Sequence, residues 1–198
     1  MEEAVRPNPA SADHRLAWGN DAEVARACLR GEPEAFQELL SRYRKPTLSL
    51  AYQMLGNGED AEDVAQEAFV RVFQSLGGFR GQAAFSTWLY RIVTNLCLGR
   101  IRSRKHACVP LGDGPEPEAP ETPSRQVAEA LVTHQVLAKM SPELRAVLLL
   151  REQGELSYQE IAASLALPLG TVRSRLSKAR ACFREIWSEF LLSREATP

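Results

Sequence analysis

The chain has 198 residues, of which 44% are hydrophobic and 25% are charged. This composition is ordinary for a soluble globular protein, and it is enough for one moderate core or two small ones. No stretch approaches the roughly 18 consecutive apolar residues of a membrane-spanning helix. Residues 1–20 lack the basic start and the apolar stretch of a signal peptide, so we expect a flexible leader on a cytoplasmic protein.

Basic and acidic residues are separated along the chain, although the net charge is only −1. Residues 79–106 and residues 161–184 contain no Asp or Glu, yet they carry six and five Arg or Lys respectively. Acids gather instead at residues 59–67 and 113–121. Solvated helix faces usually mix both signs, so two acid-free basic stretches favour two separate contacts with nucleic acid.

Helix signals recur along the chain from Asn20 onward. Asn20 can cap a first helix, with Glu23 at its third position, and Pro33 suits the first turn of the next helix. A third helix is predicted from Asn57 to Leu76, where two glycines end it, and a fourth from about residue 85 to 105. On the third helix, one set of side chains is predicted to pack inward: Val64, Ala68, Phe69, Val72, Phe73 and Leu76.

A segment rich in Pro, Gly and acids follows at residues 107–125, which predicts an extended acidic linker. Four more helices are predicted after it, over about 126–139, from Pro142, from Ser157 and from Pro168. No segment predicts a strand. The expected fold is therefore all-α, with two small helical domains over residues 21–106 and 126–195.

The segment from Ser157 to Arg180 predicts a helix-turn-helix. Apolar residues of its second helix recur at helical spacing, from Val172 to Phe190, and require a core. The alternative is an ordinary surface helix. However, small and cationic side chains on the complementary face suit entry into the major groove of DNA, and they are Arg173, Ser174, Ser177 and Lys178.

A second candidate site lies on the fourth predicted helix. Leu89, Ile92, Val93 and Leu96 form its buried stripe, while a set of polar side chains recurs every four residues on another face. The loop before this helix is small, Gly-containing and positively charged, and such loops with aromatics can hold unstacked bases. Trp88 and Tyr90 are the ambiguous residues, because either could belong to the core. The polar set consists of Thr87, Arg91 and Asn95.

No cofactor, metal site or enzymatic site is predicted. The four cysteines (Cys28, Cys97, Cys108 and Cys182) have no metal-ligand spacing, and inert thiols are the favoured interpretation, with a redox role for Cys108 as the alternative. The three histidines lie near no candidate nucleophile, and there is no phosphate-binding loop, so any DNA opening must use binding energy. A plain helix-turn-helix regulator remains the principal rival function.

Three motifs together resemble extracytoplasmic-function (ECF) sigma factors of the sigma-70 family. Residues 60–73 and 85–95 closely resemble the second conserved region of that family, and residues 157–180 resemble its fourth. The resemblance implies a protein that binds core RNA polymerase and directs it to promoter DNA. It also implies an anti-sigma factor as partner, and no membrane insertion of the chain's own.

The resemblance also implies roles for particular residues. The linker can span about 60 Å at roughly 3.3 Å per residue. In the family that this chain resembles, it would connect two domains that each bind one promoter element. The outward acidic and amide residues of the third helix would bind the clamp helices of the polymerase's largest subunit: Asp60, Asp63, Gln66 and Glu67. The −10 element would be melted and read, with one base flipped out, by Arg80, Phe85, Thr87, Trp88, Arg91 and Asn95. The −35 element would be read by Arg173, Ser174, Ser177 and Lys178.

Overall fold

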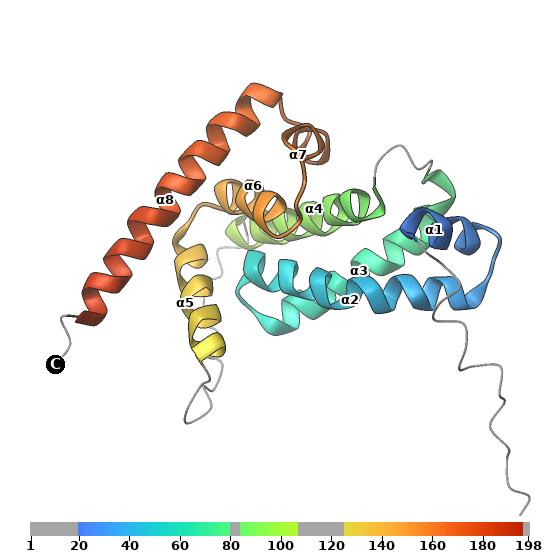
Figure 1. The fold of residues 1–198 in the computed structure, drawn as a ribbon, viewed down its shortest axis with the longest axis horizontal. Helices are drawn as coiled ribbons and strands as arrows, with labels where there is room; N and C mark the ends of the chain where they lie inside the picture. Colours follow the sequence, from blue (N-terminus) through green and yellow to red (C-terminus); the bar gives the residue numbers. More distant parts are fainter. Residues whose placement is uncertain (1–19, 80–83, 107–124, 196–198) are drawn as a thin grey trace, which may run out of the picture.

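The computed structural model describes residues 20–79, 84–106 and 125–195. The leader, Arg80 and the predicted linker with Cys108 lie outside the described residues. All the regular structure within these ranges is helical, as predicted (Figure 1). The helices are α1 (Asp21–Leu29), α2 (Pro33–Leu55), α3 (Gly58–Ser75) with a 3₁₀ turn (Leu76–Gly78), α4 (Phe85–His106), α5 (Arg125–Lys139), α6 (Pro142–Glu152), α7 (Tyr158–Leu165) and α8 (Leu169–Glu195).

Local capping sets several of these boundaries. The Asn20 side chain accepts a hydrogen bond from the Glu23 amide at 3.1 Å, which satisfies a free donor in the first turn of α1. Asn57 caps α3 in the same way. Ser157 and Glu160 form a complete capping box at the start of α7. These caps confirm the helix starts predicted from the sequence.

The N-terminal half, α1 to α4, is built around the long helix α2, which contacts each of the other three. Apolar side chains from all four helices meet in its interior, where Leu89 and Val93 of α4 are fully buried. In the C-terminal half, α5 to α8, the helix α8 packs against α5, α6 and α7. Its residues Val172, Leu176 and Ala179 are buried, as their spacing predicts.

The two halves pack against each other and share one continuous core. Figure 1 shows α6 lying along α4, while the C-terminal end of α8 extends away from the other helices. Between α2 and α5, the Tyr52 and His134 rings stack with centroids 4.7 Å apart. The sequence predicts two tethered domains, and the structure adds an interface between them that no local pattern encodes.

The described cysteines are Cys28, Cys97 and Cys182, and they are free thiols. Burial raises the pKa of Cys97 to about 12 and also raises the pKa of Cys28. A thiol with a raised pKa is a poor nucleophile, because the thiolate is the reactive form. These two cysteines are therefore packing residues, as the sequence predicts.

His134 makes the stability of this fold sensitive to acid. Burial lowers its pKa below the ordinary value of 6.5, and the nearby charge of Arg145 lowers it further. As the pH falls through 6.5, the unfolded chain binds a proton that the folded chain does not. The free energy of unfolding should therefore fall on acidification, by at most about 1.4 kcal/mol per pH unit.

Urea unfolding at pH 7.5 and pH 5.5 measures this effect. The His134→Gln variant should lose less stability between the two pH values than the parent chain, because its side chain does not titrate. An equal loss in both proteins would contradict the assignment.

Candidate functional site

One candidate surface is the outward face of α3. Asp63 is exposed and pairs with Arg100 of α4 at 2.9 Å. Gln66 is exposed, and the exposed Glu67 pairs with Arg71 one helical turn later at 2.6 Å. These three side chains form the polar line that the sequence predicts. Their partners are themselves accessible, so a cationic ligand can compete for the carboxylates.

Asp60 does not belong to this exposed line. Only 6% of the residue is accessible, and its carboxylate binds Arg100 at 3.0 Å and also Arg104. Both arginines come from α4, so Asp60 holds α4 against α3. It therefore positions the two helices, and its direct contact with polymerase stays a prediction.

Beside the polar line lies an apolar groove of about 690 Å³ between α2 and α3. Phe73, which is predicted to pack inward, is 66% exposed and contacts Phe36 edge-on, with ring centroids 5.1 Å apart. Val70 is also exposed. The lining of this groove therefore supplies a hydrophobic contact surface that helical periodicity alone does not reveal. We call it the α3 groove; its apolar lining includes Phe36, Leu40, Leu48, Phe69, Val70 and Phe73.

The second candidate surface is the start of α4. We define the α4 face as Thr87, Arg91 and Asn95, of which Arg91 and Asn95 are exposed. Thr87 is only 7% exposed, because α7 covers it, and its hydroxyl donates to the Glu160 carboxylate at 2.8 Å. The sequence predicts that these three residues share one face of α4, but it does not predict that α7 packs over Thr87.

Aromatic residues support the start of α4. Phe85 is buried and contacts Trp88, with ring centroids 5.8 Å apart. Phe79 packs on both rings, at 5.8 Å from Phe85 and 5.2 Å from Trp88. Tyr90 is buried, which resolves its ambiguity in favour of the core, whereas Trp88 remains partly exposed. Trp88 thus keeps ring surface available for stacking, and Phe85 holds it in place.

The third candidate surface is the start of α8. We define the α8 face as Arg173, Ser174, Ser177 and Lys178, all of which are exposed as predicted. The turn before α8 contains Ala166 in the left-handed conformation, with φ of 53°. The amide of Leu167 donates to the Ala162 carbonyl at 2.9 Å and closes the turn. Alanine takes a conformation that glycine adopts more cheaply, so the backbone is strained there.

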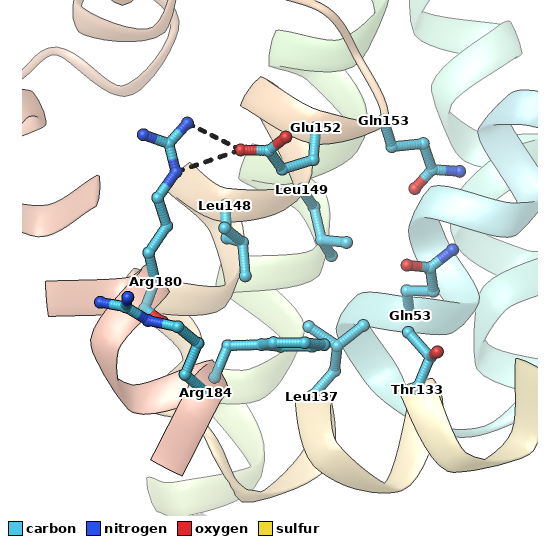
Figure 2. A pocket seen from close by; sticks show the side chains of 10 residues that line it. Gln53, Thr133, Leu137, Leu148, Leu149, Glu152, Gln153, Arg180 and Arg184 are labelled. Atoms are coloured by element: carbon cyan, nitrogen blue, oxygen red, sulfur yellow. Dashed lines mark hydrogen bonds and ion pairs between the residues drawn. The ribbon is translucent and has the colours of Figure 1, made fainter. Parts of the chain in front are cut away.

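A pocket of about 720 Å³ lies mainly within the C-terminal half. Gln53 contributes from α2, and the other lining residues come from α5, α6, α8 and Gln153, which directly follows α6. Figure 2 shows Leu137, Leu148 and Leu149 along the pocket, with the Arg180 and Glu152 ion pair beside it at 2.8 Å. The pocket is therefore mainly a gap between helices of the C-terminal half, with α2 at its edge.

Nothing in the described part of the chain offers a place for metal chemistry: no three His, Cys, Asp or Glu side chains gather there as a metal site would require. The same ranges contain no helix long and apolar enough to span a membrane. What the described surfaces supply is binding chemistry: exposed cations, amides, hydroxyls and one apolar groove.

Comparisons with known proteins agree on one family. Residues 39–107 match the sigma-70 region 2 family and residues 130–183 match the sigma-70 region 4 family. The chain is 36% identical to the RNA polymerase sigma-H factor of Pseudomonas aeruginosa, over 83% of this chain and 92% of the relative. It is 34% identical to the ECF RNA polymerase sigma factor SigW of Bacillus subtilis, over 79% of this chain and 90% of the relative.

Solved structures show the same fold. The sigma factor RpoE of Bartonella quintana, in complex with the anti-sigma factor NepR, has a TM-score of 0.65 at 20% identity, over 77% of this chain and 96% of that chain. CnrH, in complex with the cytosolic domain of CnrY, has a TM-score of 0.64 at 25% identity, over 85% of this chain and 97% of that chain. The chain therefore belongs to the ECF group of the sigma-70 family of RNA polymerase sigma factors.

Proposed function

We propose that this chain binds core RNA polymerase, directs it to promoters by reading a −10 and a −35 element, and promotes DNA melting there. The proposed units are a leader at 1–20, a region 2 domain at 21–106, a linker at 107–125 and a region 4 domain at 126–195. The observation that carries this function is the presence in one chain of three separate accessible surfaces: the α3 groove with its polar line, the α4 face and the α8 face.

Polymerase binding is assigned to α3. Asp63, Gln66 and Glu67 offer exposed acceptors to cationic side chains of the clamp helices, and the α3 groove beside them offers apolar area. An exposed aromatic beside polar groups is the usual composition of a protein–protein hot spot. Asp60 contributes indirectly, because its ion pairs with Arg100 and Arg104 fix α4 relative to this surface.

Reading and melting of the −10 element are assigned to the start of α4. Asn95 and Arg91 can donate hydrogen bonds to an unpaired base and to the backbone, and Trp88 offers a ring for stacking. The buried Phe85 ring packs against Trp88 and supports its position. Thr87 belongs to the same face, and Arg80 belongs to the preceding loop, outside the described residues. Extraction of a base costs a few kcal/mol, which these contacts repay.

Reading of the −35 element is assigned to the α8 face. Arg173 and Lys178 can donate to guanine or to phosphate, and Ser174 and Ser177 can pair with base edges or phosphate. The helix-turn-helix holds this face outward, because α7 and α6 pack on the opposite side of α8. Two weak readers on one chain gain affinity through effective concentration when their spacing fits the promoter.

The proposed partners are core polymerase, promoter DNA and an anti-sigma factor. The last is suggested by the similar sigma factor RpoE, which was solved in complex with the anti-sigma factor NepR. We propose a cytoplasmic location and action by binding alone, without catalysis of its own. A plain helix-turn-helix regulator would explain α7 and α8 but would leave the α3 groove without a purpose.

Transcription in vitro tests the proposal directly. Purified chain and sigma-free core polymerase are incubated with genomic DNA, and the transcript starts are sequenced. The expected result is initiation at a limited set of sites that share two upstream elements. Unselective initiation, or no stable complex with core polymerase, would refute the function.

Phe73 gives a sharper test of the polymerase surface. Phe73→Ala should weaken binding to core polymerase by about tenfold, since burial of an exposed aromatic ring at an interface is worth more than 1 kcal/mol. The fold should be unaffected, because the ring is 66% exposed. Leu192→Ala is the matched control, with the same exposed fraction on α8. Fluorescence titration with labelled core polymerase measures the affinity of both variants. If both bind as tightly as the parent chain, the α3 groove is not part of the polymerase-binding surface.

A further inference from the structure

Tyr43 of α2 lies at a point where three helices of the N-terminal half meet. Its hydroxyl donates to the Asp21 carboxylate in the first turn of α1. The same hydroxyl interacts with the Ser86 side chain in the first turn of α4. Its ring packs against the Phe85 ring of α4, with centroids 5.2 Å apart. One side chain of α2 therefore joins the start of α1 to the start of α4.

The Asp21 carboxylate is itself held in position. One of its oxygens accepts from Tyr43, and the other accepts from Arg42 at 3.1 Å. Arg42 also pairs with Glu38 one helical turn earlier, at 2.8 Å. Burial, together with the hydrogen bond to Asp21, raises the pKa of Tyr43, so its hydroxyl keeps the proton that it donates. Both ends of the hydrogen bond between Asp21 and Tyr43 are therefore fixed.

This series of contacts ends at the aromatic residue that we propose to stack on DNA. Phe85, which the Tyr43 ring contacts, packs on Trp88 with ring centroids 5.8 Å apart. Phe85 is buried, whereas Trp88 keeps exposed ring surface. Side chains in a close-packed interior cannot shift without moving their neighbours. The position of Trp88 therefore depends on the Tyr43 ring through Phe85.

The helix that carries Asp21 contacts the elements on either side of residues 79–84. Figure 1 shows α1 beside the 3₁₀ turn that follows α3, and α1 also contacts α4. Val24 and Ala27 anchor α1 in the core of the N-terminal half, because both are fully buried. Thus α1 gives Asp21 a fixed position, from which it can hold Tyr43 against α4.

We propose that Tyr43 is a positioning residue for promoter melting: anchored by Asp21, it fixes Phe85 and thereby the angle at which Trp88 meets an unpaired base. Aromatic rings prefer particular stacking geometries, so a rotated or displaced Trp88 ring would stack less well on a base. Neither Tyr43 nor Asp21 touches DNA in this arrangement. This inference rests on the proposed function of the start of α4.

Tyr43→Phe tests the inference, because it removes the hydroxyl and keeps the ring. The assays use full-length chains in complex with core polymerase, at a temperature where circular dichroism shows every variant folded. Tyr43→Phe should form the closed complex as the parent does. Its equilibrium constant for promoter opening, measured by permanganate footprinting, should be at least about fivefold lower. Tyr52→Phe is the matched control and should open normally, because Tyr52 is a partly buried tyrosine of α2 whose ring stacks on His134.

Substitutions at Asp21 separate positioning from a general loss of structure. Asp21→Ala removes the acceptor and should reduce opening as Tyr43→Phe does. Asp21→Asn keeps a side-chain carbonyl oxygen as acceptor and should recover most of the opening. The double variant Tyr43→Phe/Asp21→Ala should open as well as the weaker single variant, because both substitutions remove the same hydrogen bond.

Fluorine NMR of chains labelled with fluorotryptophan follows Trp88 directly, and Trp88→Phe assigns its signal. This signal should shift in Tyr43→Phe and Asp21→Ala but not in Tyr52→Phe. Parent-like opening by Tyr43→Phe would refute the inference, and so would reduced opening without a change in the Trp88 signal. If the parent chain in complex with core polymerase opens no promoter, the proposed function itself is refuted.

Discussion

Asn95→Ala should abolish most promoter opening while leaving the first encounter with the promoter nearly intact. Asn95 is exposed on α4, one turn beyond Arg91, and its amide can both donate to and accept from a base edge. A bidentate side chain–base contact is worth about 1–3 kcal/mol. If the contact forms only with the flipped base, its loss reduces the open fraction by up to about 100-fold.

Permanganate footprinting measures opening, because it modifies unpaired thymines, and gel mobility at low temperature measures the closed complex. Arg173→Ala and Lys178→Ala should show the opposite of the Asn95→Ala result. These variants should weaken the closed complex, yet they should open normally once polymerase saturates the promoter. If Asn95→Ala opens the promoter as the parent does, the assignment of the α4 face to melting is wrong.

The sequence predicts the helices of this protein well, because their ends are set by neighbours in the chain. Asn20, Asn57 and Ser157 each cap a helix through an amide three residues later. The buried stripes of α4 and α8 follow from helical spacing in the same way. Pro46 lies inside α2, where a proline usually breaks or kinks a helix, yet α2 runs from Pro33 to Leu55.

The candidate surfaces are predicted less completely, since burial depends on partners far along the chain. Phe73 has the spacing of a core residue, but the position of α2 leaves its ring exposed beside Phe36. Asp60 has the spacing of an exposed acid, but Arg100 and Arg104 of α4 enclose it. Thr87 is covered by a helix more than seventy residues later, as the separation of 73 residues from Glu160 shows.

The interface between the halves escapes sequence analysis for the same reason. Its contacts join residues that carry no motif, such as Ser49, Gln153 and Arg145. Separate motifs predict separate modules, and nothing in either module specifies that the other will pack on it. The linker length sets only the largest distance between them.

Arg145 should prove to be the most important single polar side chain for the stability of this fold. It is 7% exposed, and burial lowers its pKa from the ordinary value. Its guanidinium donates to the carbonyls of Met54, Ala138 and Met140 at 2.7, 2.8 and 3.1 Å. One cation therefore satisfies backbone acceptors of both α5 and α2.

Arg145→Ala removes all three donors and leaves buried carbonyls without partners. Hydrogen bonds from charged donors contribute about 1.5–3 kcal/mol each, so the free energy of unfolding should fall by at least about 3 kcal/mol. Arg145→Lys should recover only part of the loss, because an ammonium cannot reproduce the planar spread of a guanidinium. Arg184→Ala is the control: this exposed arginine of α8 donates to the Arg180 carbonyl one turn earlier, and its removal should cost about 0.5 kcal/mol or less.

Urea unfolding followed by circular dichroism gives the free energy of unfolding of the three variants and of the parent chain. A loss below about 1 kcal/mol for Arg145→Ala would mean that water replaces the guanidinium without penalty. Arg145→Lys keeps the positive charge, so the difference between the two variants measures what the geometry of the guanidinium itself contributes to stability.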